Sequence, residues 1–453
     1  MATPDELRIR MYNVGFGDCF LLTFFYKGAK PEERHVLIDF GSTAAPENRP
    51  SQMAAVAKDI DDTTHGRLDA VIATHRHADH ISGFTTSKGK GTGDVIARIA
   101  KNALVIQPWT EEPNLAKNAT APANVRAAKG QRGLALRQVK SLESMHDIAA
   151  SIVRSARRLD VKRMDAENVD EQTLAAIPVR DAGVGSQLRE RLGFIGETNL
   201  KNDSAVRNLM SMSKQKEYLY YGAKTKLEGK VLPGVKVHVL GPPTADQHKA
   251  ILKERSKDPA EFWQLAARAA EVTAQPQSPM LFPRAKSIRG ATVPKSVRWF
   301  VRRLRAVQAQ QMLELVRIID SAMNNTSLIL LFEIGSKLVL FPGDAQIENW
   351  EYALKYASDR SENLARLKKV TLYKVGHHGS LNATPKTLWK LIGKRAKLVT
   401  LMSTRPGKHG NPKAQTEVPR STLVTALKKG SQLHSTAALR GRGLKALYDE
   451  VTI

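Results

Sequence analysis

Imidazole and carboxylate side chains cluster at three points of the chain, at spacings that suit metal binding. The densest cluster, residues 74–80 (THRHADH), directly follows the apolar run LDAVIA and holds three histidines and an aspartate. Neutral imidazole nitrogens and carboxylate oxygens are the usual ligands of Zn²⁺, Mn²⁺ or Fe. A strand that stops abruptly would present this loop at the edge of a sheet. The segment therefore predicts a metal site.

Two later segments add residues of the same kind. Residues 341–344 (FPGD) end a β-type run with Asp344, a carboxylate that could bridge two cations. Residues 375–380 (VGHHGS) follow another such run with His377 and His378. Either segment alone also fits an ordinary turn, but the three segments together, in this order, indicate one metal centre.

The elements that must position these residues alternate between strand-like and helix-like segments. In the first part of the chain, a helix-like segment at 51–60 interrupts β-type runs at 7–14, 19–26, 35–41 and 68–75. The late part has strand-like runs at 327–334, 337–344, 371–376 and 396–402, with helices at 347–356, after Pro385 and near 421–429. Such alternation, with strands that end in polar loops, predicts an α/β layered fold.

The middle of the chain has a different composition. Residues 111–228 are rich in Ala, Arg, Lys and Leu with helical spacing, and a second helical block covers 244–323. One β-type run, GVKVHVLGPP, lies between them. We therefore predict a β-rich core with two helical insertions, in which the core comprises residues 1–110, 229–243 and 324–453.

Charge is the unusual feature of the composition. The 453 residues include 70 Lys and Arg against 44 Asp and Glu, a net charge of +26. Most of the excess lies in residues 281–310 and 361–453, which favours a polyanionic partner such as nucleic acid, a nucleotide or acidic lipid over a merely soluble surface. Arg302, Arg303 and Arg305 are the candidate phosphate-binding residues. The neighbouring Trp299 and Phe300 could stack on bases or form the apolar face of a helix.

The single cysteine limits the redox chemistry and the compartment. Cys19 alone cannot form a disulfide framework or a Cys-rich zinc module, which predicts a reducing compartment. The N-terminus lacks an apolar signal core, and the longest apolar run, residues 19–26, is far shorter than the ~20 residues that span a bilayer. We therefore expect a cytoplasmic protein without membrane association. The oligomeric state is left open.

The order of the three clusters resembles the metallo-β-lactamase fold superfamily, which shares H-x-H-x-D-H, then G-D, then H-H-G-S. The details resemble the soluble hydrolase domain of the ComEC DNA-uptake competence family and its free-standing relatives. VGFGD (14–18) is similar to that family's V-G-Q-G-D, VLIDFG (36–41) to its strand ending in Asp-x-Gly, NNTSLIL (324–330) to its N-x-S-[LV] strand and GVKVHVLGPP to its L-x-P-P strand. The resemblance covers residues 7–110, 230–243 and 324–412, about half of the chain.

The resemblance implies a four-layer αββα sandwich with two divalent metal ions, preferably Zn²⁺ and alternatively Mn²⁺. It also implies an orienting role for Asp39 beneath the site. Ser380 and Asn382 could touch the substrate or be surface turn residues. The implied ligands are His75 and His77 for the first ion, Asp79 and His80 for the second, Asp344 as the bridge, and one of His377 and His378, preferably His377, to complete the second site.

The chain departs from the superfamily pattern at two places. Most members have a further histidine as third ligand of the first metal, where this chain starts a strand with Asn324-Asn325-Thr326-Ser327. His238 could substitute, although a strand histidine is the simpler interpretation. The family's G-H-P motif corresponds to residues 408–412 (KHGNP), in which His409 is shifted.

The implied chemistry is hydrolysis by a metal-activated hydroxide. Two cations would lower the pKa of a shared water and polarise the substrate, and Asp79 and His378 are the candidate catalytic residues. The chain has no G-x-S-x-G elbow. Clustered basic charge favours a phosphodiester of nucleic acid or a nucleotide-derived molecule. Two alternatives stay open: a small non-nucleic substrate such as a lactone or thioester, and a partner-dependent component of a bacterial defence-type system that docks a protein through its helical insertions.

Overall fold

The computed structural model describes the regions on which the three clusters lie. These regions are residues 3–28, 31–113, 122, 202–244, 246–248, 323–380, 384–393, 397–409, 412, 417–439 and 444–453. They belong to one compact unit of the chain. Most of the two predicted insertions lies outside these ranges, together with the candidate substrate residues Arg302, Arg303, Arg305 and Asn382 and the aromatic pair Trp299 and Phe300.

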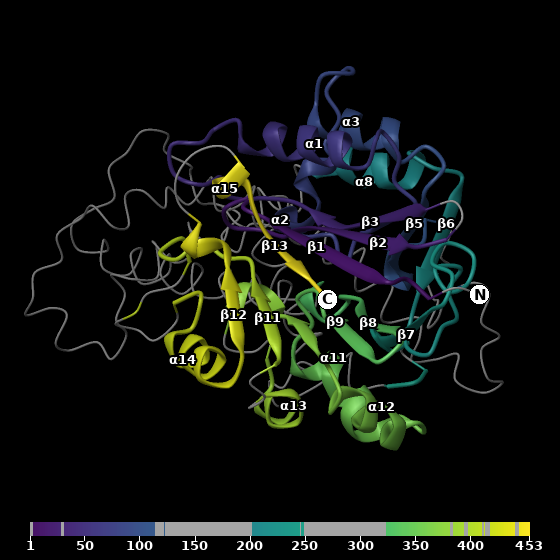
Figure 1. Cartoon of the computed structure of the whole chain (residues 1–453), viewed down its shortest axis with the longest axis vertical. Helices are drawn as coiled ribbons and strands as arrows, with labels where there is room; N and C mark the ends of the chain where they lie inside the picture. Colours follow the sequence, from purple (N-terminus) through teal and green to yellow (C-terminus); the bar gives the residue numbers. More distant parts are fainter. Residues whose placement is uncertain are drawn as a thin grey trace, which may run out of the picture. The chain divides into compact units, whose positions relative to one another are not determined.

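The first sheet is built mainly from the N-terminal part of the chain (Figure 1). Among the described residues its spatial order is β13-β1-β2-β3-β4-β5-β6. Neighbours from β13 to β3 pair antiparallel, and neighbours from β3 to β6 pair parallel. The strands are β1 (Glu6–Tyr12), β2 (Cys19–Tyr26), β3 (Glu32–Phe40), β4 (Ala70–Ile72), β5 (Leu104–Pro108), β6 (Gln215–Leu219) and β13 (Tyr448–Thr452).

The second sheet is built from the later part of the chain, and its spatial order is β12-β11-β10-β9-β8-β7 in the described regions. The strands from β9 to β12 pair parallel, while β8 pairs antiparallel with both β7 and β9. The strands are β7 (Val235–Gly241), β8 (Ile329–Ile334), β9 (Lys337–Phe341), β10 (Leu372–Lys374), β11 (Val399–Met402) and β12 (Gln432–Ser435).

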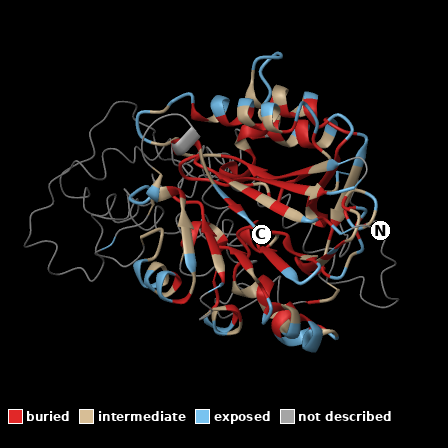
Figure 2. Cartoon of the chain, viewed as in Figure 1, coloured by how far each residue is buried: buried red, intermediate tan, exposed pale blue. Residues whose placement is uncertain are grey.

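The two sheets pack against each other through apolar side chains. One core cluster contains residues from both sheets, and the rings of Phe20 on β2 and Phe341 on β9 meet edge to face at 5.4 Å between centroids. Figure 2 shows this interior as almost wholly buried. Because both faces of the central strands are covered, their sequences are nearly continuous apolar runs, as in CFLLTFFY of β2.

Helices cover the outer face of each sheet (Figure 1). Those packed on the first sheet share a second apolar cluster, to which Val56, Ile96 and Leu209 contribute. Those packed on the second sheet share a third cluster around Trp350 and Leu388. The helices are α1 (Gln52–Thr63), α2 (Ala78–Ile81), α3 (Thr92–Ile99), α8 (Asp203–Ser211), α11 (Ile347–Glu351), which continues as a π-helical turn over Tyr352–Tyr356, α12 (Arg360–Leu367), α13 (Lys386–Ile392), α14 (Ser421–Gly430) and α15 (Leu444–Leu447).

The architecture is thus a mixed α/β sandwich, which confirms the predicted α/β class. The predicted end of the first insertion at residue 228 needs correction, because α8 packs on the first sheet and β6 forms its edge. The sequence QKEYL of β6 is only partly buried and lacks an apolar run, so hydrophobic patterning does not reveal it. None of the helices in the described regions is long and apolar enough to cross a membrane.

One ion pair links the outer strands of the two sheets and should make stability depend on pH. His434 Nδ1 on β12 lies 3.0 Å from Asp449 Oδ2 on β13, and this hydrogen bond raises the pKa of His434. A raised folded-state pKa means that the stabilisation is complete below the unfolded value of about 6.5 and is lost as pH rises through the folded value.

We therefore expect His434→Gln to lower the free energy of unfolding more at pH 5.5 than at pH 8.5. The difference should stay within about 1 kcal/mol, because both side chains are partly exposed. Urea unfolding at the two pH values, with Asp449→Asn as the matched variant, measures it. An equal loss at both pH values would contradict the assignment.

Candidate metal centre

The three sequence clusters lie in loops that leave the strands at the same edge of the two sheets. Residues 74–80 follow β4, Asp344 follows β9, and His377 and His378 follow β10. β9 and β10 are parallel neighbours, so their carboxyl ends bring the second and third loops together, and the packing of the two sheets brings the loop after β4 to the same edge. Gly343 (φ 54°) makes the approach possible, since a Cβ atom there would lie 2.9 Å from the Thr74 side chain.

Four side chains at this edge form a group that could hold a metal ion. One ligand atom from each of Asp79, His80, Asp344 and His378 lies within 4.8 Å of the others, and all four residues are buried. His80 Nε2 lies 3.0 Å from Asp344 Oδ2, and His378 Nε2 lies 3.1 Å from Asp79 Oδ2 and 3.7 Å from Asp344 Oδ2. The group combines residues from all three clusters.

The structure favours His378 over His377 as the histidine of this group, which reverses the preference stated from the sequence. The His378 side chain is fully buried, whereas that of His377 is 21% exposed with its Nε2 3.9 Å from Asp344 Oδ2. The turn from Gly376 to Gly379 holds both histidines at positive φ, 44° and 52°. This left-handed conformation is uncommon for non-glycine residues and turns the second imidazole inward.

His75 and His77 lie beside this group as a convergent pair. Both are buried, His75 Nε2 lies 3.0 Å from His77 Nδ1, and the rings of His75 and His80 are 4.1 Å apart. The Thr74 hydroxyl donates to Asp39 Oδ2 at 2.7 Å, so its oxygen can accept the Nδ1 proton of His75 at 3.2 Å. That tautomer leaves a lone pair on His75 Nε2, facing His77.

A second layer of hydrogen bonds orients the imidazoles. His80 Nδ1 donates to Asp39 Oδ2 at 2.8 Å, and His378 Nδ1 donates to the carbonyl oxygen of Ser403 at 3.1 Å. Each bond leaves Nε2 directed at the carboxylates of the group, the arrangement by which proteins fix histidine ligands. Asp39 therefore lies where the sequence analysis predicted it, beneath the site.

Two buried charged residues at the centre were missed from the sequence. Asp18 forms an ion pair with Lys374, and Asp18 Oδ1 lies 3.4 Å from His378 Nδ1. Asp18 is the last residue of the VGFGD motif, which was quoted only as a resemblance. Lys374 lies within the run TLYKVG, where nothing in the pattern marks it as buried. The motif could have pointed to Asp18, but no sequence signal points to Lys374.

The charges of the centre are strongly coupled. Burial opposes protonation of His80 and His378, but the nearby carboxylates, Asp344 first among them, outweigh the effect of burial. The pKa of His80 is therefore raised, and that of His378 is raised to about 10. Burial, together with His80 and His77, lowers the pKa of His75. Burial would raise the pKa of Asp344, yet the neighbouring cations, led by His80, hold it well below its usual range. A cation that binds these imidazole nitrogens must therefore compete with protons.

The residues present fit a metal ion. Asp79 Oδ1 is buried and has no hydrogen-bond partner within the described part of the chain, and in the same group His80 Nε2 and Asp344 Oδ2 converge to 3.0 Å. Native proteins rarely leave such buried polar atoms unsatisfied, and a cation bound between them would satisfy them. Imidazole and carboxylate donors suit Zn²⁺ and Mn²⁺ alike.

The remaining candidates lie around this centre or away from it. Ser380 ends the same turn, with its N–H donating to the His377 carbonyl oxygen at 2.8 Å. His238 lies on β7 and pairs with Glu333 on β8 at 2.8 Å, which confirms the strand interpretation. The His409 ring contacts Phe16 at 4.3 Å, and Phe16 also contacts His378 at 4.5 Å.

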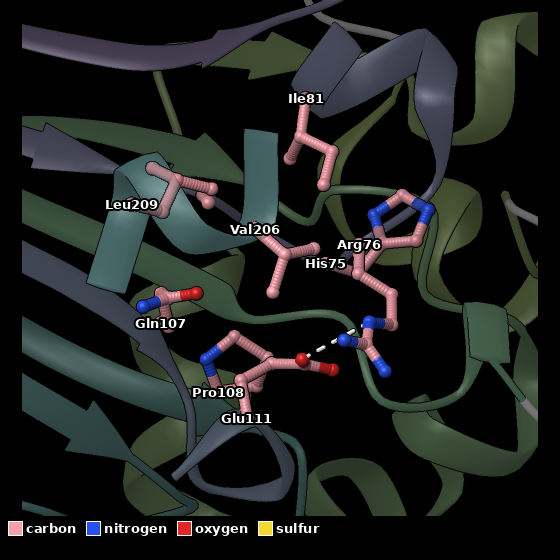
Figure 3. A pocket seen from close by; sticks show the side chains of 9 residues that line it. His75, Arg76, Ile81, Gln107, Pro108, Glu111, Val206 and Leu209 are labelled. Atoms are coloured by element: carbon pink, nitrogen blue, oxygen red, sulfur yellow. Dashed lines mark ion pairs between the residues drawn. The ribbon is translucent and has the colours of Figure 1, made fainter. Parts of the chain in front are cut away.

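A narrow recess lies on the other side of His75 (Figure 3). Gln107, Val206 and Leu209 contribute to its lining, and Arg76 pairs there with Glu111 at 3.2 Å. The ion pair holds the Arg76 guanidinium beside Glu111, in the turn that follows β5. The recess therefore lies between the loop that carries His75, the end of β5 and helix α8.

Comparison with protein-family models and with curated proteins found no match.

Proposed function

We propose that the protein is a metal-dependent hydrolase of the metallo-β-lactamase fold, most similar in its motifs to the ComEC-like branch. The observation that carries the proposal is the buried group of Asp79, His80, Asp344 and His378, whose ligand atoms lie within 4.8 Å of one another beside His75 and His77. The proposal includes a four-layer αββα arrangement, which the two packed sheets with helices on their outer faces support.

The centre would hold two divalent cations, with Zn²⁺ the first candidate. Such ions, when bound, supply Lewis acidity and lower the pKa of water toward neutrality. His75 and His77 would hold one ion, and Asp79, His80 and His378 the other, with Asp344 between them. Asp39 and the Ser403 carbonyl oxygen keep the imidazole tautomers fixed. The buried position of the ligands excludes bulk water from them.

The proposed substrate is a phosphodiester of nucleic acid or a nucleotide-derived molecule. The supporting observation is the net charge of +26, because clustered Lys and Arg attract phosphate groups. The candidate phosphate-binding residues Arg302, Arg303 and Arg305 lie outside the described residues and stay a prediction. A lactone or thioester substrate and a partner-dependent role are outcomes that the experiment must separate.

A substrate panel tests the proposal. Zinc-loaded protein is expected to cleave single-stranded DNA, RNA or a cyclic nucleotide, with a rate that falls steeply between ~50 and ~300 mM salt. The variant Arg302→Ser/Arg303→Ser/Arg305→Ser should raise KM and leave the zinc content unchanged. If the protein cleaves only a lactone or thioester, at a rate insensitive to salt, the phosphodiester substrate is contradicted and a small non-nucleic substrate is supported. Zinc-loaded protein without turnover on any of these, but with a stably bound protein, would support the partner-dependent role instead.

A further inference from the structure

The Lys374 side chain is fully buried at the end of β10, directly beneath the candidate metal centre. Lysine is almost never fully buried unless it is paired. Its ammonium forms an ion pair with Asp18, donates a hydrogen bond to the Gly343 carbonyl oxygen at 3.1 Å and lies 3.5 Å from Asp344 Oδ1. A lysine has three N–H donors, so each of them can meet an oxygen here.

The two carboxylate oxygens of Asp344 have different neighbours. Oδ1 accepts the His377 backbone N–H at 3.0 Å and faces Lys374. Oδ2 faces His80 Nε2 at 3.0 Å and His378 Nε2 at 3.7 Å. Lys374 therefore helps to fix which oxygen of Asp344 is directed at the other three members of the group.

The same ammonium connects the two sheets at the edge that carries the centre. Asp18 lies in the loop between β1 and β2 of the first sheet, where its N–H donates to the Asp79 carbonyl oxygen at 2.8 Å. Lys374 lies on a strand of the second sheet. The ion pair therefore joins the loop that supports Asp79 to the strand that precedes His378.

Charge balance gives Lys374 a second effect. Asp18, Asp39, Asp79 and Asp344 are all buried, and like charges in a low-dielectric site repel strongly. A divalent cation compensates part of this charge only while it is bound. Lys374 compensates Asp18 and Asp344 permanently, and removal of one partner of a buried ion pair leaves an uncompensated charge.

We propose that Lys374 is a positioning residue for the metal centre: its ammonium holds Asp344 and balances the buried carboxylates, so that the group is formed before a divalent cation binds. This inference rests on the metal centre of the proposed function. It assigns Lys374 no contact with the substrate. Its consequence is that loss of Lys374 should make folding depend on metal.

Thermal unfolding of metal-free and Zn²⁺-loaded protein tests the inference. Lys374→Met is expected to lower the metal-free midpoint by roughly 5–10 °C and the zinc-loaded midpoint by less than half of that, since the ion replaces the missing charge. Asp18→Asn/Lys374→Met, which also removes the charge of Asp18, should regain only part of the metal-free midpoint, because Asp344 still lacks the ammonium. Asp18→Asn alone is the matched control, because Lys374 then keeps its contacts with Asp344 and with the Gly343 carbonyl oxygen.

The outcomes separate the inference from the function on which it rests. An equal loss of the midpoint with and without Zn²⁺ in Lys374→Met would show a purely structural ion pair and overturn the inference. If Lys374→Met folds only when Zn²⁺ is added, the inference is supported. If it folds under neither condition while the double variant folds, the inference is overturned as well. A wild-type midpoint that does not respond to Zn²⁺ would instead contradict the metal centre.

Discussion

Replacement of His378 by alanine is expected to remove about one of two bound zinc ions and to lower hydrolysis at least about 100-fold. The reason is geometric: His378 is fully buried, and its Nε2 lies 3.1 Å from Asp79 Oδ2 and 3.7 Å from Asp344 Oδ2. The ion held with Asp79 and His80 would lose a ligand that nothing else in the described group replaces. Elemental analysis of the purified variant and its rate on the best phosphodiester of the panel measure the two effects.

The neighbouring histidine provides the control. His377→Ala should retain both ions and lose less than about tenfold in rate, because the contact that His377 makes with Asp344 Oδ1 comes from its backbone N–H, which alanine keeps. Both positions have positive φ, so the two substitutions meet the same backbone constraint. The opposite result, with zinc lost in His377→Ala and kept in His378→Ala, would support His377 as the ligand, as preferred from the sequence.

The choice between these histidines shows where the sequence stops being informative. β9 and β10 are parallel neighbours, and β4 lies in the other sheet, which packs against theirs. The order of the three clusters correctly predicted that the loops after these strands meet. It could not show which of two adjacent imidazoles points inward, since that depends on the left-handed turn at His377 and His378. The order of the strands in each sheet was likewise beyond the sequence.

The charged residues beneath the centre were missed for a related reason. Asp18 follows a glycine turn and Lys374 ends a strand, and both patterns are typical of solvent-exposed residues. They meet because two sheets from distant parts of the chain pack face to face, which hydrophobic patterning cannot specify in register. Asp39 was placed correctly because the resemblance, rather than the pattern, supplied it.

Asp344 is the residue whose charge the centre needs most, because its Oδ2 faces His80 and His378 and its Oδ1 faces Lys374. Asp344→Asn keeps the shape of the side chain and removes the charge, so we expect both zinc ions to be lost and hydrolysis to fall by more than about 1,000-fold. His378→Ala, by comparison, should lose one ion. Elemental analysis of the two variants side by side therefore tests whether Asp344 lies between two ions.

Asp39→Asn is the control for this prediction, because Asp39 contacts His80 Nδ1 at 2.8 Å without joining the group of four. Substitution of a residue that only orients a ligand typically weakens metal affinity 10–100-fold, so Asp39→Asn should keep zinc at saturating concentration and lose it more readily to a chelator. The Asp344→Asn variant should fail to bind zinc at any practical zinc concentration. If Asp344→Asn kept two ions, Asp344 would be a structural partner of Lys374, and the proposed dinuclear hydrolase would lose its central ligand.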